Sequence, residues 1–117
     1  MRVLLESPFA GKDEKQIERN LKYARACMRD CFLRGEAPFA SHLLYTQEGI
    51  LDDKVPEERK LGIDAGLLWG MGAKKTVVYT DLGITKGMRY GINKAKDAMR
   101  PFKLRKLPPE VLAEVLG

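Results

Sequence analysis

Three short apolar runs in this chain are each followed by small or polar residues that could hold a ligand. The first run, Val3-Leu4-Leu5, leads into Ser7-Pro8-Phe9-Ala10-Gly11, where Ser7 offers a hydroxyl, Phe9 an aromatic wall and Gly11 room for close backbone approach. A helix that begins behind such a loop presents free N–H groups and a positive dipole end, which suit phosphate. An ordinary turn is the structural alternative for this loop.

A carboxylate follows the most β-branched run of the chain. Asp81 comes directly after Thr76-Val77-Val78-Tyr79-Thr80, where its two oxygens could accept hydrogen bonds from the vicinal hydroxyls of a sugar. A turn or cap aspartate is the structural alternative. The segment behind it could begin a second helix that receives an anion, through Gly83, Thr85, Gly87 and Met88.

His42 is the only histidine, and it follows the second apolar run, Ala37-Pro38-Phe39-Ala40. It could be a hydrogen-bonded structural residue, but its place at the end of an expected strand favours ligand contact. Together with Phe9 and Tyr45 it could frame a nucleobase.

Asp64 is a second candidate for catalysis, because it shares a helix face with Leu61 and Leu68. A carboxylate on an apolar face is either paired or directed at a site, since burial without a partner is unfavourable. A salt bridge is the alternative.

Cys27 and Cys31 are the only cysteines. They lie on one helix face without further ligands at suitable spacing, so we expect buried thiols, no metal and no cofactor.

Composition limits the class of protein. The chain has 117 residues and a formal net charge of +5, enough for one domain spanning residues 1–117. It contains no apolar run near the ~20 residues that span a bilayer, and its start lacks the pattern of a signal peptide. We therefore expect a cytoplasmic protein without a membrane partner. Its basic residues are interspersed with acidic ones and match no nucleic-acid module, so a nucleic-acid partner is not expected.

The elements that must position these residues alternate along the chain. Asp13 and Gln16 form a capping-box pattern, Pro56 with its acidic neighbours marks a helix first turn, and Thr85 is a plausible cap. The stretch 43–54 has no clean period and is expected to be a long loop. We expect strands near 3–5, 37–42, 76–80 and 102–107, and helices near 13–34, 56–71, 85–99 and in the tail after Pro109.

Strands that alternate with helices predict a parallel sheet covered on both faces. We therefore expect a single α/β domain with about four parallel strands in a flavodoxin-like (Rossmann-like) order. Ligands bind beyond the carboxyl ends of the strands in such sheets, which would collect the loops after the first three strands at one edge.

Self-association is expected from apolar surface. The tail helix carries Val111, Leu112, Val115 and Leu116 with little core left to cover, and Trp69 could also lie near a surface. Exposed apolar patches of that size usually mark an interface.

Four stretches of the chain, SPFAG, ARACMRDCFLRGEAPFASHLLYTQ, PEERKLGIDAGLLW and VVYTDLGITKGM, resemble a small, often phage-borne uncharacterised family. That family is similar to the nucleoside 2-deoxyribosyltransferases and nucleotide N-glycosidases. The resemblance implies a nucleotide pocket and an oligomer. It also implies a glutamate nucleophile on the helix after a glycine-containing loop, and matching Gly87 to that loop puts this position at Gly91, where no carboxylate stands.

Three functions follow from this departure. In the first, the protein binds a nucleoside phosphate or ADP-ribose-type ligand without turnover, which could sequester a nucleotide signal of host immunity. In the second, it is an N-glycosidase or deoxyribosyltransferase whose carboxylate is Asp81 or Asp64. In the third, it is an interaction module without a small ligand. Release of free base, retention of intact ligand, or neither would separate the three.

Overall fold

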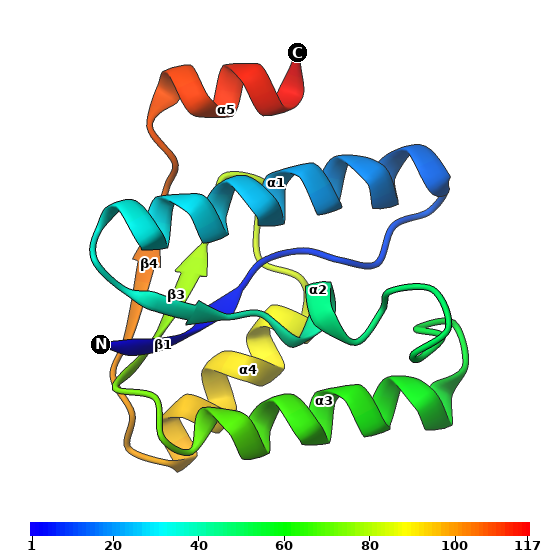
Figure 1. The fold of residues 1–117 in the computed structure, drawn as a ribbon, viewed down its shortest axis with the longest axis vertical. Helices are drawn as coiled ribbons and strands as arrows, with labels where there is room; N and C mark the ends of the chain where they lie inside the picture. Colours follow the sequence, from blue (N-terminus) through cyan, green and yellow to red (C-terminus); the bar gives the residue numbers. More distant parts are fainter.

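Four parallel strands form one sheet in the order β2-β1-β3-β4, with helices on both faces (Figure 1). The computed structural model describes residues 1–117. In this order β2 lies on one side of β1, and β3 and β4 lie on the other, which confirms the expected flavodoxin-like arrangement. The elements are β1 Arg2–Glu6, α1 Glu14–Leu33, β2 Ala37–Phe39, α2 Ser41–Leu44, α3 Pro56–Gly70, β3 Lys75–Tyr79, α4 Lys86–Asp97, β4 Phe102–Arg105 and α5 Pro109–Leu116.

The two faces of the sheet have different cores. α1 and α5 cover one face, while α3 and α4 lie on the other (Figure 1). Since side chains alternate along a strand, Val3 and Leu5 point toward α1, where they join the larger core cluster. Leu4 and Glu6 must then point toward α3 and α4.

Two expected caps are present. The Asp13 carboxylate accepts a hydrogen bond from the Gln16 N–H at 2.9 Å, and Thr85 Oγ1 accepts one from the Met88 N–H at 3.2 Å. Each cap satisfies an N–H that the first helical turn leaves free. None of the helices is both long and apolar enough to cross a membrane.

The second strand is shorter than expected. It ends at Phe39, and the following residues turn into α2, so that His42 lies on a helix rather than at a strand end. The N–H groups of Leu43 and Leu44 both donate to the Ala40 carbonyl. These local bonds replace the ladder that a longer strand would need.

Three large apolar residues on α3 are mostly exposed to solvent. Leu61, Leu68 and Trp69 are 60%, 69% and 69% exposed. The helix packs instead through Gly66 and Gly70, which are buried. A Cβ at Gly66 would lie 2.6 Å from the Ser41 Cβ, and one at Gly70 would overlap the Leu4 side chain. Glycines at a spacing of four residues therefore let α3 approach β1 and α2 more closely than any larger residue would.

The tail helix is not free. Val111, Leu112 and Val115 of α5 pack against the core cluster beneath α1, and of the four apolar residues only Leu116 is largely exposed. α3 exposes more apolar surface than α5, through Leu61, Leu68 and Trp69.

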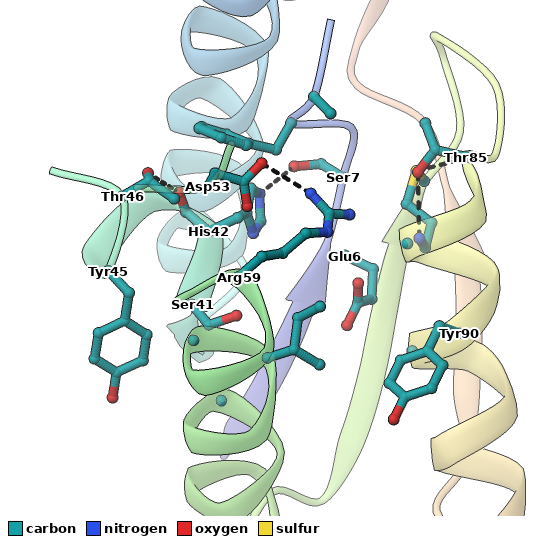
Figure 2. A pocket seen from close by; sticks show the side chains of 18 of the residues that line it. Glu6, Ser7, Ser41, His42, Tyr45, Thr46, Asp53, Arg59, Thr85 and Tyr90 are labelled. Carbon is teal, nitrogen blue, oxygen red and sulfur yellow. Dashed lines mark hydrogen bonds and ion pairs between the residues drawn. The ribbon is translucent and has the colours of Figure 1, made fainter. Parts of the chain in front are cut away.

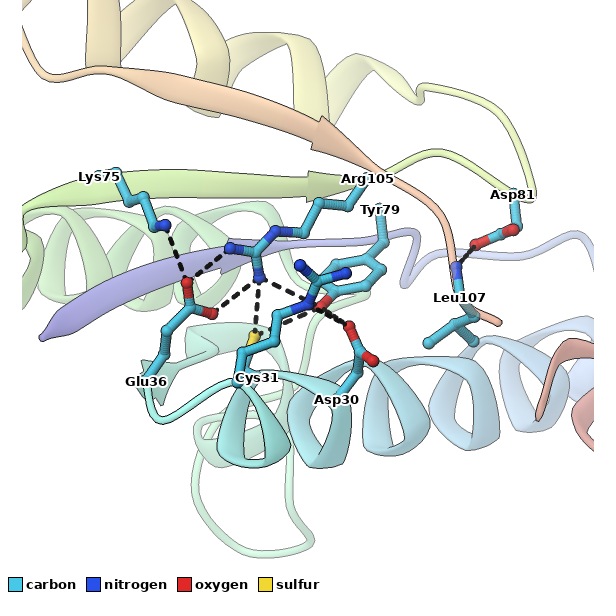
Figure 3. A network of polar contacts seen from close by, with 9 residues as sticks. Asp30, Cys31, Glu36, Lys75, Tyr79, Asp81, Arg105 and Leu107 are labelled. Carbon is cyan, nitrogen blue, oxygen red and sulfur yellow. Dashed lines mark hydrogen bonds and ion pairs between the residues drawn. The ribbon is translucent and has the colours of Figure 1, made fainter. Parts of the chain in front are cut away.

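A buried ion-pair network joins the edge strand to the end of α1 (Figure 3). Arg105 donates from both Nη atoms to the Glu36 carboxylate, at 2.7 and 2.5 Å, and Lys75 pairs with Glu36 at 2.9 Å. The hydrogen bonds from Arg105 hold the pKa of Glu36 down at about 2, against the opposing effect of burial. Tyr79 extends the network by donating to Asp30 at 2.6 Å.

Replacing Glu36 should destabilise the fold. Glu36→Gln leaves Arg105 buried without a counter-charge, which should lower the free energy of unfolding by about 3–5 kcal/mol at neutral pH. The folded-state pKa is lowered, so this contribution is present above about pH 4.5 and is lost as pH falls toward about 2. Urea unfolding at several pH values, with the exposed Glu48→Gln as control, measures both effects; equal stability of Glu36→Gln and parent at pH 7 would contradict them.

Self-association stays a prediction, and its expected surface moves from α5 to α3. Burying Leu61, Leu68 and Trp69 against a second copy would remove apolar surface from water. Light scattering at micromolar concentration should give a mass above the 13.2 kDa of one chain, and Leu68→Lys should reduce it. A monomer for the parent chain would rule this surface out as an interface.

Candidate functional site

A cavity of about 540 Å³ opens between α3 and α4, beyond the carboxyl end of β1. This is the edge at which parallel α/β sheets bind ligands. Its volume lies in the range of small-molecule sites. Figure 2 shows side chains from β1, α2, α3 and α4 directed toward this space.

The structure brings together most of the residues predicted for the site. Phe9 and Ser7 come from the loop after β1, and His42 and Tyr45 from α2 and its end. Others do not line the cavity: Pro8, Asp81, Gly83 and Asp64 lie outside it, and Gly11 borders an adjoining cavity of about 910 Å³. From the start of α4 the lining includes Thr85, Gly87 and Met88.

Ser7 and His42 form a hydrogen-bonded pair. Ser7 Oγ lies 2.8 Å from His42 Nε2, and the edge of the Phe9 ring meets the imidazole with centroids 6.2 Å apart. Burial lowers the pKa of His42 to about 4, so the ring is neutral at pH 7. The pair therefore offers a ligand neutral donors and acceptors, not a positive charge.

Glu6 lines the cavity and was not predicted from the sequence. It ends β1 on the same face as Leu4, so its carboxyl enters the cavity between α3 and α4 (Figure 2). The Glu6 carboxyl makes no hydrogen bond or ion pair within the chain. Burial raises its pKa to about 8, and the charge of Arg100 opposes this effect. The sequence did contain a signal for this placement. Glu6 ends an apolar strand two residues after Leu4, so both side chains point to the same face of the sheet.

Gly91 on α4 makes the room for Glu6. A Cβ at position 91 would overlap the carboxyl group of Glu6. The place that a side chain at position 91 would fill is therefore held by a carboxyl from β1.

Arg59 supplies positive charge on the α3 side of the cavity. Its Nη1 pairs with Asp53 at 2.8 Å, and its Nη2 would lie 3.5 Å from a Cβ at Gly87. The guanidinium thus sits beside the first turn of α4, whose free N–H groups also favour an anion. Arg59 was not predicted because a helical arginine among charged neighbours resembles an exposed one.

No group of three or more His, Cys, Asp or Glu side chains is arranged to hold a metal ion.

Asp81 has a different task from the one predicted. Its carboxylate accepts a hydrogen bond from the Leu107 N–H at 3.0 Å (Figure 3), and another from the Tyr23 hydroxyl at 2.6 Å. These bonds tie the loop after β3 to α1 and to the segment after β4. Asp64 is exposed and pairs with Lys60 at 2.6 Å, which is the salt bridge given as its alternative.

A solved structure has a similar fold. It is a 2-deoxyribosyltransferase from the psychrotolerant bacterium Bacillus psychrosaccharolyticus, described as a biocatalyst for nucleoside synthesis, with a TM-score of 0.61 at 20% identity. The match covers 91% of this chain and 72% of the other. At this identity the similarity shows the fold alone. No curated protein matches the chain.

A family model matches residues 1–105, which include the whole sheet and every residue that lines the cavity. The family carries the description "domain of unknown function". The chain therefore belongs to the family DUF7768.

Proposed function

We propose that this protein binds a phosphorylated nucleoside-type molecule, a nucleoside phosphate or an ADP-ribose-type ligand, in the cavity between α3 and α4. The observation that carries the proposal is the cavity itself: it combines aromatic walls, the neutral Ser7–His42 pair and the basic side chains of Arg59 and Lys86 at the carboxyl end of the sheet. A fold shared with a 2-deoxyribosyltransferase supports a nucleoside as the ligand class.

The base would lie against the aromatic side of the cavity. Phe9 and Tyr45 offer apolar ring surface, and the Ser7–His42 pair can hydrogen-bond an edge of the base without charge. Such neutral pairing suits a nucleobase, which is itself uncharged near pH 7.

The phosphate would lie near the start of α4. There Arg59 and the first-turn N–H groups of Lys86 and Gly87 converge on one side of the cavity. Arg59 now pairs with Asp53, and a phosphate would compete with this carboxylate for the guanidinium. A planar guanidinium can bind a phosphate through two parallel hydrogen bonds.

The proposed role is retention of the ligand, with sequestration of a nucleotide signal of host immunity as the biological use. N-glycosidic cleavage or deoxyribosyl transfer is the alternative. Because Asp81 and Asp64 lie outside the cavity and are already paired, this alternative needs a different carboxyl.

Removing the guanidinium should weaken binding of phosphorylated ligands selectively. Arg59→Gln should cost roughly 1.5–3 kcal/mol of binding, the scale of a hydrogen bond to a charged group, and should leave unphosphorylated nucleosides nearly unaffected. Calorimetry with paired nucleosides and nucleoside monophosphates measures the difference, with Lys60→Gln as the matched control on the exposed side of α3. Equal losses for both ligand classes would contradict the proposed phosphate position.

Asp81→Ala should reduce stability and leave affinity unchanged. It removes the acceptor of Tyr23 and Leu107, so we expect the free energy of unfolding to fall by about 1–3 kcal/mol. The ligand that the parent chain binds should bind the folded variant within about twofold. A large loss of affinity in a variant that remains folded would restore Asp81 to the site and show that this assignment is wrong.

A further inference from the structure

The Glu6 carboxyl is unlike the other enclosed carboxyls of this protein. Glu36 is paired with Arg105, Asp30 accepts from Tyr79, and Asp81 accepts from Tyr23. Glu6 has no such partner, although its residue is only partly exposed and its carboxyl faces the cavity. An unpaired carboxyl in this setting is unfavourable for folding. Its presence is therefore better explained by a ligand than by stability.

We propose that Glu6 is the catalytic acid of an N-glycosidic bond cleavage carried out in this cavity. The inference rests on the proposed function for its nucleoside-type ligand, and it replaces retention of that ligand with cleavage, the alternative given above. Its geometric basis is the direction of Glu6 from β1 into the cavity (Figure 2) and the position of its carboxyl where a Cβ at Gly91 would lie.

A protonated carboxyl is suited to the acid role. At pH 7 burial keeps Glu6 mostly in its neutral form, with a pKa of about 8. A neutral carboxyl can donate a proton to a leaving nucleobase, whereas a nucleophile would have to be ionised. Glu6 thus differs from a carboxylate that attacks the sugar.

The step is balanced by one water molecule. The C1′–N bond breaks, its electron pair stays with the base nitrogen, and the Glu6 proton neutralises the departing base. Water then adds to C1′, and the proton that it loses restores the protonated carboxyl. The products are the free base and the free sugar or sugar phosphate, with no oxidant, reductant or metal consumed.

Other charged and titratable groups around the cavity decide how Glu6 titrates. Arg100 lies on the sheet side and favours ionisation of Glu6. It is held by hydrogen bonds to Thr76 Oγ1 and the Gly70 carbonyl, both at 3.1 Å. The remaining groups that line the cavity are His42 near α2, Asp53, Glu58 and Arg59 at α3 and the loop before it, and Lys86 and Tyr90 on α4.

The first experiment measures base release by the full chain. Purine and pyrimidine nucleosides and their 5′-monophosphates are incubated with the parent, Glu6→Gln and Asp64→Asn, and free base is followed by chromatography. We expect release by the parent and by Asp64→Asn, and a kcat lower by about 100-fold to 10,000-fold in Glu6→Gln with KM within about threefold. An equal rate in Glu6→Gln would overturn the inference.

Two further readouts separate an acid from a structural role. The parent's kcat/KM should be constant below about pH 8 and fall above it, because the acid must be protonated. Glu6→Gln should keep most of its rate on 4-nitrophenyl β-D-ribofuranoside, whose leaving group needs no proton. Equal losses on nucleosides and on this activated glycoside would contradict an acid role.

Calorimetry on the same panel distinguishes failure of the inference from failure of the proposed function. Intact ligand bound by the parent without release of base would overturn catalysis by Glu6 and leave the binding function standing. Neither binding nor release would overturn both. Loss of folding does not confound the test, because Gln is close in shape to a protonated Glu and should give a folded protein in thermal unfolding.

Discussion

Close contact between helices and sheet through glycine determines the shape of the ligand face. Gly66 and Gly70 bring α3 onto Ser41 and Leu4, and Gly91 brings α4 onto Glu6. Each of these positions lacks the space for one more carbon atom. The two helices are therefore held near the sheet along their buried glycines, and the cavity lies between them at the end of β1, where the strand runs out.

The polar groups on the two faces of the sheet differ in how completely they are paired. On the α1 side, the carboxylates of Glu36, Asp30 and Asp81 are all paired with arginine, tyrosine or backbone partners. On the α3–α4 side, Glu6 is unpaired, and Arg59 has a single, partly exposed carboxylate partner. Groups that are fully satisfied hold the fold together, and groups that are not remain available to a ligand.

The architecture could be predicted from the sequence because alternation, caps and edge residues are local signals that all indicated the same fold. Several residues of the loops that line the cavity were predicted from the sequence, but two of its ionisable side chains, Glu6 and Arg59, were not. The direction of the Asp81 side chain could not be predicted, because a residue after a strand can turn to either face of the sheet. Tyr23, whose hydroxyl donates to Asp81, is 58 positions away in the chain. The exposed Leu68 shows a similar limit: apolar periodicity cannot reveal that a helix packs through glycines.

The Glu6 carboxyl, on β1, fills the space that a side chain at position 91 of α4 would need. The constraint runs through the larger group: a side chain at 91 requires a smaller residue at 6, and a carboxyl at 6 requires glycine at 91. In related sequences these two positions should vary as a pair. An evolutionary path that moved an acidic group between strand and helix would have to pass through an intermediate with small residues at both positions, with a larger cavity and no carboxyl at all.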